Sequence, residues 1–272
     1  EGFEFSLNTV NIRNKNFTWS STFGLSHNKN TIKHLYYRYE DVLNEVGEVV
    51  GSKEVDDVNR GWFVGKDISA IWDHEFIGIW QEDEAEEAAK YGQQPGDAKV
   101  RDVNGDYKIT QEDKVFLGQE TPKFRWSFRN EFTLFRNWDI SLNLYSQMGH
   151  KQSTTEYLNF FDNLGDYSNT YKREYWTPEN KSNSYARLKS TRPSNINPKK
   201  VINKGFIRLE NISVSYRVPQ QFARKLMAKE ISIYGTVRNV AVWAFDKEWD
   251  YWDPETKGLL PRTFTFGASI TF

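Results

Sequence analysis

Apolar and polar residues alternate with a period of two in seven stretches of the chain. In 263–272, for example, Phe264, Phe266 and Ile270 fall on one side, and Thr265 and Ser269 fall on the other. Such alternation is typical of a β-strand that has one apolar and one polar face. The seven predicted strands lie at about 3–8, 17–26, 124–134, 138–145, 205–218, 231–238 and 263–272. In 205–218 the alternation changes phase near Glu210 and Asn211, which predicts a β-bulge.

Two kinds of fold fit this pattern. A soluble antiparallel sheet exposes its polar face to water and buries its apolar face. A transmembrane barrel turns its apolar face to lipid and its polar face to the lumen. The alternation by itself does not distinguish them.

The connections favour the barrel. Every second connection is long, at about 28–121, 149–204 and 243–260, whereas those at 11–16, 135–137 and 219–229 are shorter. Outer-membrane barrels have short periplasmic turns and long extracellular loops. We therefore predict an all-β fold, a segment of a transmembrane antiparallel barrel with long extracellular loops. Seven strands do not make the even strand number of a bacterial single-chain barrel, so we expect the C-terminal part of a larger barrel.

The composition agrees with this fold and narrows the function. Aromatic residues make up 16% of the 272 residues, which argues against global disorder. A net charge of -1 argues against a nucleic-acid partner. No apolar run reaches the roughly 18 residues of a membrane helix, and without cysteine the chain has no disulfides or thiolate chemistry. The chain begins at Glu1 without Met, so we expect part of a longer or processed protein.

One connection contains a candidate metal site. Oxygen donors recur at the spacing of an EF-hand loop, which suits Ca²⁺. The predicted ligands are Asp102, Asn104, Asp106, the main-chain carbonyl of Lys108, and Asp113. Tyr107 stands where the EF-hand has Gly, so an acidic turn without metal stays open as an alternative. The Ca²⁺ would be structural and would fix a long loop.

Other side chains suggest binding but not catalysis. The aromatic and polar residues of 149–204, among them Tyr171, Tyr175, Trp176 and Pro178, suit sugar or peptide capture or ordinary loop packing. Residues 82–91 favour a short acidic helix that ends before Gly92 and Pro95. The predicted lumen face carries charged residues that would contact a solute or form a polar network, namely Arg125, Arg129, Glu131, Asp139 and Arg238. The histidines, His27, His34, His74 and His150, have no metal-binding spacing, and no nucleophile elbow or phosphate-binding loop occurs, so we expect no enzyme.

Several motifs occur in an order that resembles a known family. They are GFEFSLNTVNI, NFTWSSTFGLSHNKN, FIGIWQ, EEAAKYGQQPGDAKVRDVNGDYKITQEDKVFLGQETPKFRWSF, YWTPEN, FIRLENISVSYRVP and PRTFTFGASITF. Nearly the whole chain resembles the C-terminal part of SusC/RagA-type TonB-dependent transporters of Bacteroidetes. The family's Asp-x-Asn-Gly-Asp-Gly stretch falls on residues 102–107, with Tyr107 in place of the last Gly.

The resemblance implies the last seven strands of an outer-membrane barrel of about 22 strands with a plugged lumen. It implies import of an oligosaccharide or a peptide, with a SusD-like surface lipoprotein as lid. Energy would come from TonB–ExbB–ExbD through an N-terminal plug domain and TonB box, which are not in this chain. Residues 1–272 would supply part of the barrel wall and of the extracellular vestibule. The protein would lie in the outer membrane of a Gram-negative cell, where this chain would contact the lipid bilayer, the rest of the barrel and the plug. The alternative is a soluble β-rich carbohydrate-binding module with a structural calcium site.

Overall fold

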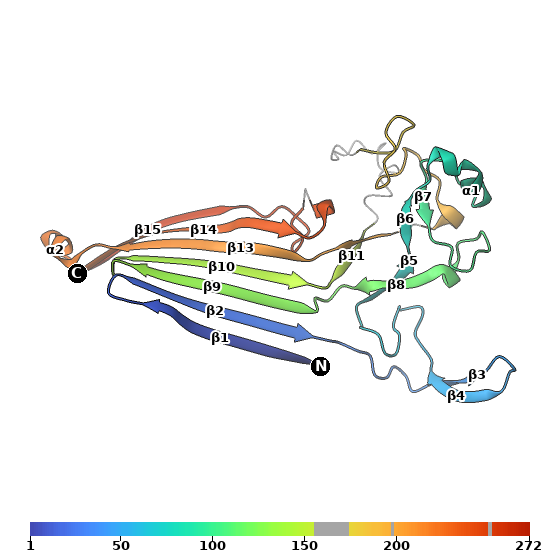
Figure 1. Cartoon of the computed structure of the whole chain (residues 1–272), viewed down its shortest axis with the longest axis horizontal. Coiled ribbons are helices and arrows are strands. Elements are labelled where there is room, and N and C mark those ends of the chain that lie inside the picture. Colours follow the sequence, from blue (N-terminus) through green and yellow to red (C-terminus); the bar gives the residue numbers. More distant parts are fainter. Residues whose placement is uncertain (155–173, 197–198, 250–251) are drawn as a thin grey trace. The chain divides into compact units, whose positions relative to one another are not determined.

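The chain divides into two compact units. The computed structural model describes residues 1–154, 174–196, 199–249 and 252–272 (Figure 1). The first unit, here called the sheet unit, combines 1–30, 121–150 and 203–272. The second, here called the connection unit, combines 31–120 and 151–202. The connection unit is therefore built from the two longest connections between strands of the sheet unit.

All seven predicted strands are present and form one antiparallel sheet in the order β1-β2-β9-β10-β13-β14-β15 (Figure 1). β1 and β15 form its two edges. The strands are β1 (Gly2–Arg13), β2 (Phe17–Asn28), β9 (Phe124–Leu134), β10 (Trp138–Met148), β13 (Phe206–Arg217), β14 (Glu230–Ala244) and β15 (Thr263–Thr271). Most are 11 or 12 residues long, close to the about 9–11 that cross a bilayer at a tilt.

The position of the turns explains why short and long connections alternate along the chain. At one end of the sheet, the side-chain oxygen of Asn14 accepts the backbone N–H groups of Asn16 and Phe17, at 3.0 and 2.8 Å. At the same end Phe135 and Arg136 both have positive φ, 50° and 65°, which reverses the chain between β9 and β10 in three residues. The connections after β2, β10 and β14 leave from the opposite end, because neighbouring strands are antiparallel.

The predicted β-bulge is confirmed. In the pairing with β10, Leu209 and Asn211 oppose the consecutive residues Leu144 and Asn143, so Glu210 is the extra residue of β13. The pairing with β14 also shifts register between Leu209 and Asn211. Its carboxylate accepts a hydrogen bond from Asn143 Nδ2 at 2.6 Å. The bulge restores the apolar phase downstream, as the sequence pattern requires.

Most apolar side chains on the apolar face of the sheet are exposed. Phe3 and Phe5 are each 50% exposed, and Phe266 is 80% exposed. Among apolar residues of these seven strands, as far as the structure describes them, only Phe206 and Ile231 are buried. A soluble sheet would bury this face against its own chain.

The connection unit has an apolar core of its own. Ile79, Ala98, Trp176 and Ala186 pack together, with Phe76 against them. Its strands are β3 (Tyr39–Leu43), β4 (Val49–Glu54), β5 (Ala70–His74), β6 (Phe76–Ile79), β7 (Ala98–Val100), β8 (Lys114–Gln119), β11 (Lys151–Thr154) and β12 (Lys200–Asn203), whose last residue falls in the sheet unit. They pair two by two, as β3-β4, β5-β8, β6-β7 and β11-β12. These short strands carry no long alternation, and the sequence pattern did not predict them.

The predicted acidic helix is confirmed. It starts with the 3-10 turn η1 (Glu82–Glu84) and continues as α1 (Ala85–Lys90). The Glu84 carboxylate accepts the backbone N–H of Gln81 at 3.0 Å, and Gly92 has a φ of 66° just beyond the end. The remaining helical turns are η2 (Gln111–Asp113), η3 (Pro193–Asn195), α2 (Gln220–Ala223), η4 (Arg224–Leu226) and η5 (Lys247–Trp249). In the part of the chain that the structure describes, none of the helices has the length and apolar character to cross a membrane.

Candidate ligand-facing site

The polar face of the sheet contains a hollow near the end from which the long connections leave. Two rows of cross-strand neighbours line it, because every second residue of an antiparallel strand points to the same side. One row runs from Glu4 to Gln147, and the next from Ser6 to Tyr145. The hollow has a volume of about 420 Å³, and its polar-face lining is Glu4, Ser6, Gly24, Ser26, Arg125, Ser127, Tyr145 and Gln147.

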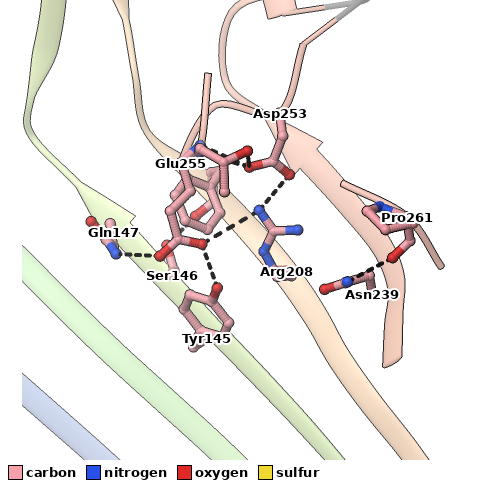
Figure 2. Close-up of polar contacts among 10 residues, drawn as sticks. Tyr145, Ser146, Gln147, Arg208, Asn239, Asp253, Glu255 and Pro261 are labelled. Atoms are coloured by element: carbon pink, nitrogen blue, oxygen red, sulfur yellow. Dashed lines mark hydrogen bonds and ion pairs between the residues drawn. The ribbon is translucent and has the colours of Figure 1, made fainter. Parts of the chain in front are cut away.

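A buried ion pair lies beside this hollow. The Nη2 atom of Arg208, on β13, donates to the carboxylate of Asp253 at 2.6 Å, and Glu255 lies 3.5 Å from the same atom (Figure 2). The side chains of Arg208 and Asp253 are only 3% and 5% exposed. Within the residues that the structure describes, Arg208 Nε has no hydrogen-bond partner. A buried donor without a partner is uncommon in folded proteins.

Glu255 extends this cluster to the lining of the hollow. Its carboxylate accepts hydrogen bonds from the Tyr145 hydroxyl at 2.6 Å and from Gln147 Nε2 at 3.1 Å (Figure 2). Asp253 and Glu255 belong to the connection between β14 and β15, whereas Tyr145 and Gln147 belong to β10. The ion pair and these hydrogen bonds therefore fold that connection over the polar face of the sheet.

The cluster was not predicted from the sequence. Arg208 sits in the polar phase between Ile207 and Leu209, which is a signal that could have found it. Asp253 and Glu255 lie in a connection without periodicity, and no sequence feature pairs them with residues 45 or 110 positions away.

The charged residues predicted on the polar face fall into two groups. Arg125 lines the hollow. Arg129 pairs with Glu131 at 2.6 Å, and Asp139 accepts the Thr133 hydroxyl at 2.8 Å. Glu131 and Asp139 also line a second hollow of about 370 Å³ lower on the face, and Arg238 is exposed beside Asn211. Arg125 thus lines the hollow, while Arg129 with Glu131 and Thr133 with Asp139 form polar contacts along the face.

His150 is buried at the sheet end that carries the hollow. It is 2% exposed, and its Nδ1 has no partner among the described residues. Burial, together with the nearby charges of Lys204 and Arg125, lowers the pKa of His150 from 6.5 to about 4. The imidazole is therefore neutral at physiological pH.

The predicted metal ligands lie in one turn, where two of their carboxylates accept backbone hydrogen bonds. The carboxylate of Asp102 accepts the backbone N–H groups of Gly105 and Tyr107, at 2.7 and 2.9 Å. Asp113 is completely buried, and its two oxygens accept the N–H groups of Val103 and Thr110. Across the described residues, no three His, Asp or Glu side chains are grouped so as to hold a metal ion.

Tyr107 has the left-handed backbone, with a φ of 62°, that the EF-hand gives to Gly. The turn therefore keeps its shape through hydrogen bonds to Asp102 and Asp113. Partial burial acts to raise the pKa of Asp102, but the hydrogen bonds from the Gly105 and Tyr107 N–H groups and from the Tyr91 hydroxyl lower it on balance. Binding of Ca²⁺ by this turn remains a prediction.

One of the aromatic residues suggested for ligand capture, Trp176, packs inside the connection unit. Trp176 is 6% exposed and lies in the core of the connection unit, and its Nε1 donates to Gln81 Oε1 at 3.0 Å. Tyr171 lies outside the described residues. The buried Asp97 joins the two long connections, because its carboxylate accepts Arg187 Nε at 2.9 Å and the Thr191 N–H at 2.8 Å. For Trp176, the reading as ordinary loop packing is the correct one.

An open antiparallel sheet with one uncovered apolar face and one hollowed polar face is a segment of a transmembrane barrel. No family model matches the chain. Two curated proteins of Formosa agariphila are similar to it over its whole length: TonB-dependent receptor P26, at 29% identity over 293 residues, and TonB-dependent receptor P3, at 24% over 306 residues. The chain spans 29% and 28% of those proteins, less than a third of their length.

Solved structures show the same fold. The chain aligns over its whole length with 29% of a chain in a structure of the RagAB peptide transporter, at a TM-score of 0.67 and 15% identity. A structure of the RagAB peptide importer in the open-open state gives a TM-score of 0.65 and 15% identity, and covers 28% of that chain. The resemblance to TonB-dependent transporters and the expected fold class are confirmed. The two curated proteins are named as receptors, not as enzymes. The soluble carbohydrate-binding module is not supported.

Proposed function

We propose that this chain forms part of the wall and outer mouth of a TonB-dependent importer in the outer membrane of a Gram-negative cell. The observation that supports it best is the exposed apolar face of the sheet. Burying a Phe or Leu side chain in an apolar phase stabilises by about 1.5–3 kcal/mol, so a face of this kind needs lipid, detergent or another apolar cover. The polar face would then line the lumen.

The substrate would be an oligosaccharide or a peptide. The hollow offers hydroxyl, amide, carboxylate and guanidinium groups, which suit either class. Passage would consist of binding and release, without covalent chemistry. The resemblance adds a SusD-like lipoprotein over the long connections, and TonB–ExbB–ExbD acting through a plug domain outside this chain.

Filling the hollow tests this function. Ser127→Trp places an indole between the rows of polar residues, and Ser232→Trp is the matched control on the polar face of β14, away from the hollow. In the full-length protein, we expect Ser127→Trp to reduce nutrient-dependent growth while the amount of protein in the outer membrane stays unchanged. Equal growth of the two variants, or recovery of the full-length protein as a soluble species without detergent, would contradict the proposal.

A separate experiment tests the partner. A SusD-like lipoprotein of the same organism should co-purify with the full-length protein in detergent. Its absence from the purified complex would remove the lipoprotein from the proposal but leave the membrane placement standing.

A further inference from the structure

The connection between β13 and β14 is the longest of those at the short-turn end of the sheet, and it is folded. Residues 220–226 form the helical turns α2 and η4 (Figure 1). The N–H of Ala228 donates to the carbonyl of Ala223 at 3.1 Å, and Met227 ends the turns in a left-handed conformation with a φ of 58°. A chain reversal alone needs only two or three residues, so the extra length requires another explanation.

Small side chains hold this segment against the apolar side of the sheet. Ala223 and Ala228 are buried against Ile231, with Val218 beside them. Ile231 pairs with Ile270 of β15, and both belong to the apolar face. The helical turns therefore continue the apolar face and do not cover the polar one.

The large apolar side chains of the segment point away from the protein. Phe222, Leu226 and Met227 are 50%, 65% and 87% exposed. All three lie within residues 222–227, so this short segment exposes a large amount of apolar surface. Contact of apolar surface with water is unfavourable by about 25 cal/mol per Å².

The charges of the segment all have the same sign. Arg224, Lys225 and Lys229 are exposed, and residues 219–229 contain no Asp or Glu. The neighbouring carboxylates of Glu230 and Asp139 both pair with Arg217, at 3.4 and 3.2 Å. Lys225 Nζ lies 5.7 Å from the centre of the Phe222 ring, so a basic group lies beside one of the exposed apolar side chains.

We propose that residues 219–229 form an interfacial anchor in the membrane leaflet at the short-turn end of the barrel. Phe222, Leu226 and Met227 enter the boundary between headgroups and acyl chains. Arg224, Lys225 and Lys229 bind the phosphates of anionic phospholipids. Exposed apolar side chains flanked by basic ones are the signature of segments that lie in this interface. This inference rests on the proposed outer-membrane function.

Fluorescence quenching tests the anchor in the full-length protein. This chain contains no cysteine, so a bimane label can be placed at Leu226→Cys without competition from residues 1–272. Phe266→Cys reports the lipid-facing side of β15, and Ser213→Cys reports the polar face of β13. The labelled proteins are reconstituted in vesicles of phosphatidylethanolamine and phosphatidylglycerol whose acyl chains are brominated, and iodide is used as the aqueous quencher.

The expected result is that brominated lipid quenches the labels at Leu226 and Phe266, but not the label at Ser213. Quenching of the Leu226 label by iodide, with Phe266 still quenched by lipid, would show a segment in water or against a periplasmic protein and would overturn the anchor alone. If lipid does not quench the Phe266 label either, the outer-membrane proposal itself fails.

A charge variant tests the phosphate contacts. Replacing Arg224, Lys225 and Lys229 together by Gln should reduce lipid quenching at Leu226→Cys in the phosphatidylglycerol vesicles. Vesicles of phosphatidylcholine alone should show little difference between the two proteins. Equal quenching with and without the three basic residues in anionic vesicles would refute the role of the charges.

Discussion

The two units of this chain place similar residues in opposite environments. The sheet unit leaves Phe5 and Phe266 half or more exposed, and most of the buried side chains of its strands are polar, such as Asn130 and Arg208. The connection unit buries Ile79 and Trp176 in an apolar core. The residue type alone therefore does not tell whether an apolar side chain is buried in the protein or exposed on its surface. One unit stabilises itself by internal apolar packing, whereas the other depends on polar interactions within the protein and on an apolar surrounding.

The largest expected effect concerns the polar interior of the sheet unit. Arg208→Ala leaves Asp253 as an unpaired buried carboxylate, so we expect a loss of about 3–5 kcal/mol in unfolding free energy. Denaturant titration in detergent micelles measures it. Arg129→Ala breaks the exposed pair with Glu131 and should cost about 0–1 kcal/mol. Similar losses in the two variants would contradict a polar interior in this unit.

The second prediction concerns the two faces of β15. Phe266→Arg places a charge on the apolar face and should cost about 2–4 kcal/mol if that face meets the bilayer. Thr265→Arg, one residue earlier, points to the polar face and should be tolerated. The amount of folded protein in outer membranes, read from heat-dependent gel mobility, separates them. If both variants assemble equally well, the apolar face does not contact lipid.

The third prediction uses the buried His150. Its folded-state pKa of about 4 lies below the ordinary 6.5, so the unfolded chain binds more protons between these values. Stability is then fully present above pH 6.5 and is lost as the pH falls toward 4, by at most about 3 kcal/mol. His150→Phe should flatten that part of the pH profile. If the unfolding free energy has the same pH dependence in the unaltered protein and in His150→Phe, other groups cause that dependence.

The smallest expected effect concerns the predicted calcium turn of the connection unit. Asp102→Ala combined with Asp106→Ala removes two candidate ligands and the backbone hydrogen bonds that they accept, so we expect 95–121 to become more sensitive to protease. If Ca²⁺ binds, chelator produces the same change in the unaltered protein. If chelator does not change cleavage of the unaltered protein, while the double variant is cleaved more readily, the turn is held by hydrogen bonds without Ca²⁺.

The sequence by itself determined the seven strands, the bulge at Glu210, the acidic helix and the order of short and long connections. These features arise from local periodicity and from turn residues such as Asn14. They also arise because only one strand register keeps all apolar side chains on the same face of the sheet. It also determined the transporter resemblance, because several motifs occur in a fixed order. The position of Arg125 on the polar face followed from the same phase.

Only the tertiary structure decided how the connections are arranged. Asp97 with Arg187, and Arg208 with Asp253, join residues that lie 90 and 45 positions apart, and no periodicity relates them. It also showed that Trp176 is a core residue and that Asn130, in the middle of an apolar alternation, accepts hydrogen bonds from Trp19 Nε1 and Ser21 on the apolar face. Each of these roles depends on which partner is near in space, and a buried polar group is stable only where such a partner is provided.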